Sequence, residues 1–218
     1  MIDVCYADVS PLMNDTIFDA AINSLVPIRR KKAETLKVRS AKNLSIGASL
    51  MLETALKKRG YNINNLDFGK DKNGKPYIIG KNIHFSLSHS GNIALCAIGD
   101  FNVGADVEEI GECNMNICKR FFQKKEYDAV ANAKTDEERN DLFFRIWTLK
   151  ESFVKMTGKG LGGFSDFEVC IDRKVNIYGL NDECFLYELE IPGYKLAVCS
   201  ETPQEINLER INIIKPFV

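Results

Sequence analysis

The stretch Asp141–Gly160, DLFFRIWTLKESFVKMTGKG, predicts a long helix that organises the rest of the chain. Apolar residues recur along it at steps of four and three, the spacing of one buried helix face. These residues are Leu142, Ile146, Leu149, Phe153 and Met156. Gly158 stands where a left-handed residue would end the helix.

A second face of this helix carries charge. Trp147, Glu151 and Lys155 lie four apart and stack along one line, and Lys150 lies about 100° round the helix from Glu151. A carboxylate held between two lysines suits a metal ion beside a phosphate. The same residues also fit an exposed Glu–Lys pair, which stabilises a helix by only a few tenths of a kcal/mol. Taken alone, the helix favours this second interpretation.

The composition is that of an ordinary soluble globular protein. The 218 residues are 45% hydrophobic and 27% charged, with a formal net charge of −1. Because nucleic-acid-binding domains usually carry a basic excess, the charge argues against a nucleic-acid partner. No run approaches the roughly 20 apolar residues of a membrane span, and the N-terminus lacks a signal-peptide pattern. We therefore expect no membrane association and a cytoplasmic location.

The cysteines indicate a reducing compartment. The seven are odd in number and include no Cys-x-x-Cys pair, and two histidines are too few for a histidine-rich zinc site. Cys96 and Cys199 lie within apolar, strand-like runs, so we expect buried free thiols.

The order of the expected elements predicts an α+β fold. One long helix or two shorter ones extend from Glu34 to Arg59 and end at Gly60, and a further helical region lies between Glu109 and Asp141. Residues 83–89 and 92–98 alternate like the strands of a hairpin. The other expected strands are residues 2–9, 102–107, 167–172, 184–191 and 195–200.

This order suggests two similar lobes, each a long helix packed on an antiparallel sheet. We expect an N-terminal lobe of residues 1–103 and a C-terminal lobe of residues 104–218. The structure of the chain after Pro203 is left open.

The sequence VGADVEE, residues 103–109, predicts a carboxylate pair. In a strand, Asp106 and Glu108 project from one face while Val107 points into the core. Two such carboxylates repel each other unless a cation or a proton lies between them, and oxygen ligands favour Mg²⁺ or Mn²⁺. Glu151 would add a third carboxylate. Without Glu151, a solvated acidic turn is the better interpretation.

Two motifs together resemble the signature of the 4′-phosphopantetheinyl transferases. That signature is Gly-Ile/Val-Asp followed, some forty residues later, by Trp/Phe-x-x-Lys-Glu-Ser/Ala-x-x-Lys. The matching residues are Gly104, Asp106, Trp147, Lys150, Glu151, Ser152 and Lys155. Flanking motifs resemble the larger, surfactin-synthetase-activator type: the basic run 27–32, Gly74-Lys75-Pro76, Ser88-His89-Ser90-Gly91 and residues 120–126.

The resemblance implies the corresponding fold and an activity. Such enzymes move the phosphopantetheine arm of coenzyme A onto a serine of an apo acyl or peptidyl carrier protein and release adenosine 3′,5′-bisphosphate. By resemblance, Asp106, Glu108 and Glu151 are the ligands of Mg²⁺ or Mn²⁺, and Glu151 is also the candidate general base. Lys150 and Lys155 would steady the pyrophosphate oxygens, or Lys155 would instead protonate the leaving group.

Coenzyme A contacts are implied in the same way. Ser88 and His89 resemble the contacts of the 3′-phosphate, helped by Arg29 and Lys32 from the basic run. Lys75 and Pro76 resemble the segment that borders the adenine and the phosphates, and Asp106 and Lys155 complete the set. The residues by themselves also fit a solvated helix entry for the basic run and an ordinary hairpin histidine for His89.

Two residues depart from the family pattern. Ala105 replaces the usual Ile or Val, which changes packing volume but no chemistry. Asn43 stands where a basic residue usually lies, so that phosphate contact is in doubt.

The carrier is expected to dock, on a monomer, at a groove between the lobes that the region 112–125 borders. The apolar residues there, Met115, Ile117, Phe121 and Phe122, also fit the core of the second lobe. Nearby lysines would steer an acidic carrier. Two other functions fit the same residues: a non-catalytic module that binds coenzyme A or a carrier, and a Mg²⁺-dependent phosphohydrolase.

Overall fold

The computed structural model describes residues 1–171, 175–179 and 184–214, which form two compact units with separate hydrophobic cores. The first unit comprises Met1–Lys70, Pro76–Asp100 and the chain from Gln204 onward. The second comprises Asp71–Lys75 and Phe101–Pro203. Asp172, the end of one expected strand, lies outside the described residues.

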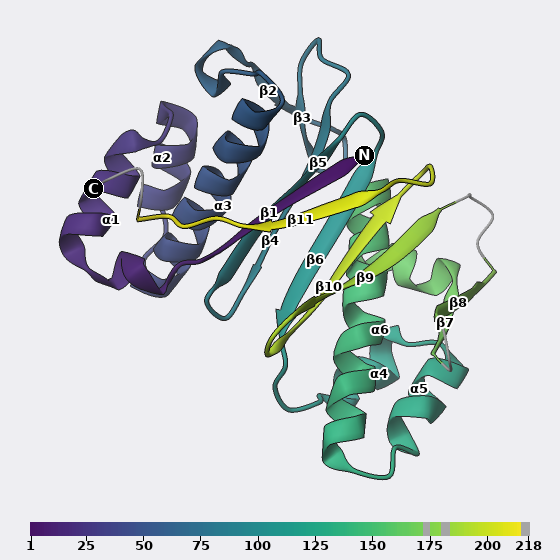
Figure 1. Ribbon diagram of the computed structural model, residues 1–218. Coiled ribbons are helices and arrows are strands. Elements are labelled where there is room, and N and C mark those ends of the chain that lie inside the picture. The colour runs from purple at the N-terminus through teal and green to yellow at the C-terminus, as the bar shows by residue number, and fades with distance from the viewer. Residues whose placement is uncertain (172–174, 180–183, 215–218) are drawn as a thin grey trace. The chain divides into compact units, whose positions relative to one another are not determined.

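In the first unit, α3 (Arg39–Lys58) packs on a four-stranded sheet ordered β11-β1-β5-β4 (Figure 1). The strands are β1 (Ile2–Asp8), β4 (His84–Ser90), β5 (Ile93–Gly99) and β11 (Ile206–Arg210). β4 and β5 form the expected antiparallel hairpin. β11, however, pairs parallel with β1, so the sheet is mixed and residues after Pro203 pack with the first unit.

Shorter elements surround this helix and sheet. The expected helical region from Glu34 to Arg59 is a single helix, α3, which begins only at Arg39; Glu34 is the last residue of α2. Gly60, at φ 79°, follows the end of α3 as expected. The sequence patterns did not predict α1 or β11. The remaining elements are η1 (Ser10–Met13), α1 (Asp15–Ser24), α2 (Pro27–Glu34), η2 (Ile63–Asn65), β2 (Phe68–Lys70) and β3 (Pro76–Ile78).

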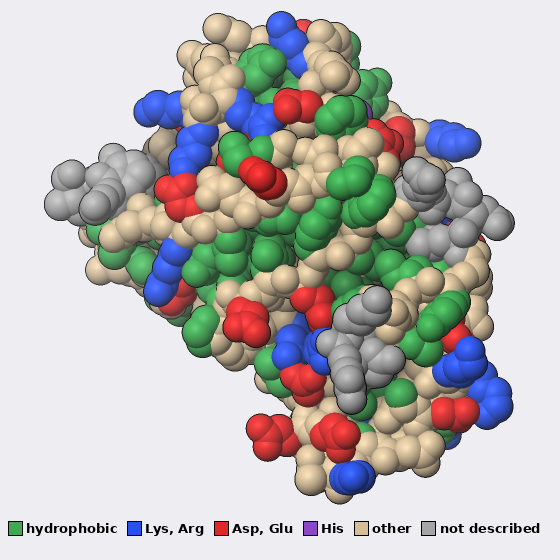
Figure 2. Space-filling model, turned by 45° about the vertical axis from the view of Figure 1, so that its right-hand side comes forward, with side chains coloured by type: hydrophobic (Ala, Val, Ile, Leu, Met, Phe, Trp, Pro, Cys, Tyr) green, Lys and Arg blue, Asp and Glu red, His purple; other side chains and the backbone are tan. Residues whose placement is uncertain are grey.

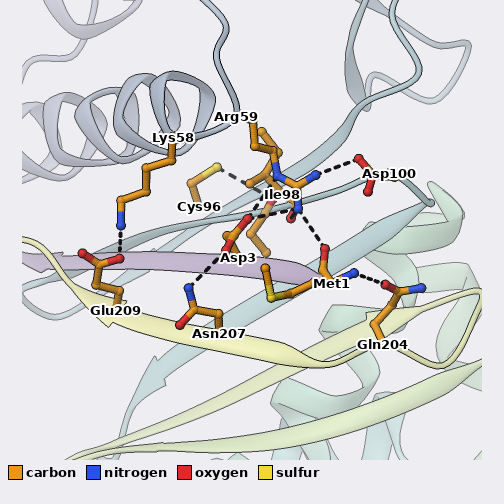
Figure 3. A network of polar contacts seen from close by, with 11 residues as sticks. Met1, Asp3, Lys58, Arg59, Cys96, Ile98, Asp100, Gln204, Asn207 and Glu209 are labelled. Atoms are coloured by element: carbon orange, nitrogen blue, oxygen red, sulfur yellow. Dashed lines mark hydrogen bonds and ion pairs between the residues drawn. The ribbon is translucent and has the colours of Figure 1, made fainter.

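Arg59, just after α3, joins the helix to the sheet of the first unit (Figure 3). Its guanidinium forms ion pairs with Asp3 of β1 (3.0 Å) and Asp100 (2.7 Å), and donates to the Met1 carbonyl (2.8 Å). Asp3 also accepts a hydrogen bond from Asn207 of β11 (3.1 Å). One side chain therefore connects the C-terminus of α3, β1 and, through Asp3, the last strand.

In the second unit, α6 (Asp136–Thr157) packs on a three-stranded antiparallel sheet ordered β6-β10-β9 (Figure 1). The Thr135 hydroxyl accepts from the Glu138 amide (3.1 Å) at the start of α6, and Gly158, at φ 73°, ends it in the left-handed conformation, as expected. The other elements are β6 (Val103–Glu109), α4 (Met115–Phe121), α5 (Lys124–Ala131), η3 (Gly160–Asp166), β7 (Glu168–Ile171), β8 (Val175–Tyr178), β9 (Phe185–Ile191) and β10 (Tyr194–Ser200).

The burial of both units follows the sequence patterns. The expected core face of α6 is buried at Ile146, Leu149, Phe153 and Met156, and Cys96 and Cys199 are buried free thiols. Basic and acidic side chains intermingle on the face drawn in Figure 2, in keeping with the net charge near zero. Within the described residues, every helix is too short or too polar to cross a membrane.

Candidate active site

The candidate site lies in the second unit, where β6 passes under α6. Gly104, Asp106 and Glu108 share one face of β6, and this face is turned to α6. A Cβ atom on Gly104 would overlap the Ser152 carbonyl oxygen and the Met156 amide nitrogen. Glycine at this position therefore lets the backbones of strand and helix touch, which brings Asp106 under the last turns of α6.

Three carboxylates and one lysine influence one another electrostatically there. Asp106 is buried, and its Oδ1 lies 2.6 Å from Nζ of Lys155. The pKa of Glu151 is raised to about 7, most of all by burial and then by the negative charges of Asp106 and Glu108, although the Lys155 ammonium lowers it. The charges of Asp106 and Glu108 thus act on Glu151.

The donor chemistry of this group fits a divalent cation, because three carboxylates supply the oxygen ligands that Mg²⁺ and Mn²⁺ prefer. Among the described residues, no three Asp, Glu, His or Cys side chains are gathered as in a formed metal site. The cation that contacts Asp106 in the structure is the Lys155 ammonium. We refer to Asp106, Glu108, Glu151 and Lys155 as the acidic cluster.

Lys150 lies elsewhere, in the core of the second unit. Its side chain is 0% exposed, and Nζ pairs with Oε1 of Glu126 at 2.8 Å. It also donates to the carbonyl oxygens of Phe164 and Phe167, both at 2.7 Å. All three ammonium protons are engaged, so the structure does not bring Lys150 into the acidic cluster. The pyrophosphate contact expected of Lys150 stays a prediction that requires these bonds to open.

Lys75 lies at the C-terminus of α6. Its Nζ donates to the Met156 carbonyl oxygen (2.6 Å) and to Oδ1 of Asn102 (2.6 Å), and burial lowers its pKa to about 8. A cation at a helix C-terminus interacts favourably with the helix dipole and thereby stabilises the helix. Pro76, the first residue of β3, belongs to the first unit. The expected coenzyme contacts of both residues stay predictions.

The first unit holds the expected phosphate-binding cations. Arg29 and Lys32 come from α2, and Nε of Arg29 donates to Oγ of Ser49 (3.0 Å) on α3. Burial lowers the pKa of Lys32, and the positive charges of Arg29 and Lys70 lower it further. An anion bound among these three cations would relieve their mutual repulsion. Lys70 was not singled out in the sequence, because no motif there marks it.

Ser88 and His89 leave β4 on opposite faces, because neighbouring side chains of a strand alternate. His89 is exposed and pairs in register with Ala94, which lies beside Gly47 of α3. Ser88 is buried on the other face. A joint contact of both side chains with one phosphate stays a prediction.

Asn43 is buried in α3 and accepts a hydrogen bond from Nε of Arg39, one turn earlier, at 3.2 Å. Arg39 in turn pairs with Asp15 at 3.0 Å. Arg39, a basic residue one turn before Asn43, is therefore already held within the fold.

The aromatic side chains of the expected docking region pack inward. Phe121 contacts the rings of Trp147 and Phe164, with centroids 6.1 and 5.9 Å away, and Phe122 contacts Phe143 at 5.7 Å. Met115 and Ile117 are also partly buried against this core. This supports the core interpretation of these residues, and carrier docking here stays a prediction.

Comparisons with known proteins agree with this arrangement. The model of the 4′-phosphopantetheinyl transferase superfamily matches residues 102–199, which include the acidic cluster. The 4′-phosphopantetheinyl transferase Sfp of Bacillus subtilis strain 168 is 31% identical over 186 residues, covering 81% of this chain and 82% of that protein. Another 4′-phosphopantetheinyl transferase of Bacillus subtilis is 36% identical over 165 residues, covering 72% and 73%. This chain belongs to the 4′-phosphopantetheinyl transferase superfamily and is of the Sfp type.

Proposed function

We propose that this transferase moves 4′-phosphopantetheine from coenzyme A to a serine hydroxyl of an apo carrier protein. The observation that carries the proposal is the acidic cluster, in which the charges of Asp106 and Glu108 raise the pKa of Glu151. Such a cluster of carboxylates is the donor set that a Mg²⁺-dependent phosphoryl transfer needs. Monomeric state and cytoplasmic location belong to the same proposal.

Each residue of the acidic cluster has a part in this chemistry. Asp106, Glu108 and Glu151 would hold a Mg²⁺ or Mn²⁺ ion, which would supply a Lewis acid toward the pyrophosphate. Glu151 is also the candidate general base that accepts the serine proton as the serine oxygen bonds to phosphorus. The phosphorus–oxygen bond to the leaving adenosine bisphosphate breaks at the same centre, and Lys155 donates to the departing phosphate oxygens.

The cations of the first unit supply a second part of the proposal. Arg29 and Lys32, with the neighbouring charge of Lys70, bind the 3′-phosphate of coenzyme A together with His89. Burial and, after it, repulsion by Arg29 and Lys70 lower the pKa of Lys32, and a phosphate between these groups would relieve that repulsion.

A carrier-modification assay tests the activity. Purified apo carrier is incubated with coenzyme A and Mg²⁺, and the intact mass of the carrier is measured. The transferase adds the phosphopantetheine mass to serine. A phosphohydrolase cleaves coenzyme A and leaves the carrier unmodified, and a binding module changes neither.

Variants of the acidic cluster test the site. Glu151→Gln and Asp106→Ala should each lower transfer by at least about 10²-fold, because each removes a proposed ligand of the ion. Lys159→Met is the matched control, since Lys159 pairs with Asp166 (2.7 Å) outside the cluster. Near wild-type turnover in either cluster variant, with folding intact by circular dichroism, would reject the proposed metal site.

The 3′-phosphate contact has its own test. His89→Ala should raise KM for coenzyme A more than for dephospho-coenzyme A, because only the former carries the 3′-phosphate. An equal rise with both substrates would mean that His89 does not contact this phosphate.

A further inference from the structure

The ion pair between Lys155 and Asp106 occupies one of the two carboxylate oxygens that Asp106 could offer to a metal ion. Lys155 Nζ lies 2.6 Å from Asp106 Oδ1, within direct charge-assisted hydrogen-bond distance. The Asp106 side chain is only 3% exposed, whereas that of Lys155 is 28% exposed. The aspartate is therefore held in place, and the lysine is the partner with room to move.

An ammonium at this carboxylate disfavours a divalent cation there. At contact distance the two positive charges repel, and burial of Asp106 reduces the water that would screen them. Lys155 on Oδ1 therefore competes with an ion for the Asp106 carboxylate. The Lys155 ammonium also acts on Glu151, whose pKa it lowers.

We propose that Lys155 is a built-in competitor of the divalent ion at Asp106, and that its displacement makes its ammonium available to substrate phosphate. This inference rests on the proposed function, because it takes Asp106 to be a metal ligand. The lysine keeps a buried carboxylate neutralised until the ion replaces it. The displaced ammonium then donates to the phosphate oxygens of the substrate. The same side chain therefore couples binding of the ion to binding of the phosphate.

A lysine that competes with the ion can be distinguished from one that only contacts phosphate. Removing Lys155 should lower turnover and yet tighten binding of the ion in the absence of coenzyme A. A lysine that acts only on phosphate would lower turnover and leave the metal affinity of the enzyme unchanged, apart from the general effect of losing one positive charge.

The experiment measures binding of Mn²⁺ to the full-length protein without coenzyme A, from the electron paramagnetic resonance signal of free Mn²⁺. The variants are Lys155→Met, Lys155→Gln and Lys155→Arg, with Lys159→Met as the matched loss of charge. Lys159 lies four residues further along the chain and pairs with Asp166 instead. Asp106→Asn tests whether the Mn²⁺ detected is bound at the proposed site.

We expect Lys155→Met to bind Mn²⁺ about tenfold more tightly than the wild type, and Lys159→Met to change the affinity by about twofold or less. Lys155→Arg should remain close to the wild type because it keeps the competing charge. Lys155→Gln should also bind Mn²⁺ more tightly, and it provides the test if Lys155→Met does not fold, because its amide still donates to Asp106.

The outcomes separate the two proposals. If Asp106→Asn abolishes Mn²⁺ binding while Lys155→Met and Lys155→Gln bind no more tightly than Lys159→Met, the competition is wrong and the metal site stands. If the wild type binds no Mn²⁺, or Asp106→Asn binds it as the wild type does, the proposed metal site itself is wrong.

Discussion

Adjacent residues of α6 meet opposite environments. Lys150 is 0% exposed and bonded inside the core of the second unit, whereas Glu151, the next residue, belongs to the acidic cluster. A turn of about 100° between successive helical residues is enough to separate the two. The sequence showed both residues in one motif, but it did not show that only one of them reaches the cluster.

The first prediction concerns the buried pair of Lys150 and Glu126. Lys150→Met should destabilise the protein by about 3–5 kcal/mol, because it leaves the Glu126 carboxylate buried without its cation. Burial already raises the pKa of Glu126. The double variant Lys150→Met, Glu126→Gln should be less destabilised, since it buries no charge. Urea denaturation measures the free energy of unfolding, and a loss below about 1 kcal/mol in Lys150→Met would contradict the prediction.

The second prediction concerns the pH dependence of stability. The pKa of Glu151 is about 7 in the folded chain, above the ordinary value of 4.5. The folded state therefore binds this proton more tightly, and the resulting stabilisation is complete below about pH 4.5 and lost as the pH rises through about 7.

With a chelator present, Glu151→Gln should accordingly gain stability relative to the wild type between pH 5 and pH 8, on the order of 2 kcal/mol. Denaturation of both proteins at the two pH values measures this difference. A difference that is the same at both would show that Glu151 titrates with an ordinary pKa.

At the scale of elements, the contact between β6 and α6 determines the geometry of the acidic cluster. The strand carries Asp106 and Glu108, the helix carries Glu151 and Lys155, and Gly104 allows their backbones to touch. Packing against α6 thus requires a glycine at this position of the motif, independently of the chemistry of the neighbouring residues.

The third prediction follows from this contact. Gly104→Ala should destabilise the protein by about 3 kcal/mol, because backbone atoms of α6 cannot yield to the added Cβ. It should also lower transfer activity in the fraction that stays folded. Gly111→Ala is the control, since a Cβ there would meet only Phe144 at an ordinary 3.9 Å. Thermal unfolding of the two variants measures the effect, and equal stability would refute the packing argument.

At the scale of the whole molecule, the last strand of the chain pairs with the first. β11 adds to the first unit beside β1, and Ile213, after the strand, is buried in that core. The expected boundaries, 1–103 and 104–218, divide the chain once, whereas the observed units divide it several times. The two expected helix-on-sheet arrangements and the α+β class are confirmed.

The fourth prediction concerns this last segment. Ile213→Ala should lower the free energy of unfolding by about 2–4 kcal/mol, because it opens a cavity in the core of the first unit.

Removing the chain from Gln204 onward should accelerate amide hydrogen exchange in β1, which loses its parallel partner, and leave β10 protected. Unchanged protection of β1 in the truncated protein would mean that β11 does not stabilise this edge.

The sequence by itself determined the family, the α+β class and the end of α6 at Gly158, and the comparisons confirm the family. These features depend on the spacing of nearby residues and on motifs that are read along the chain. Only the tertiary structure decided that Lys150 pairs with Glu126, that Lys155 contacts Asp106 and that β11 lies beside β1. The physical reason is that each of these contacts joins residues far apart in sequence, and no local pattern of spacing or charge specifies which of several possible partners a side chain or a strand will meet.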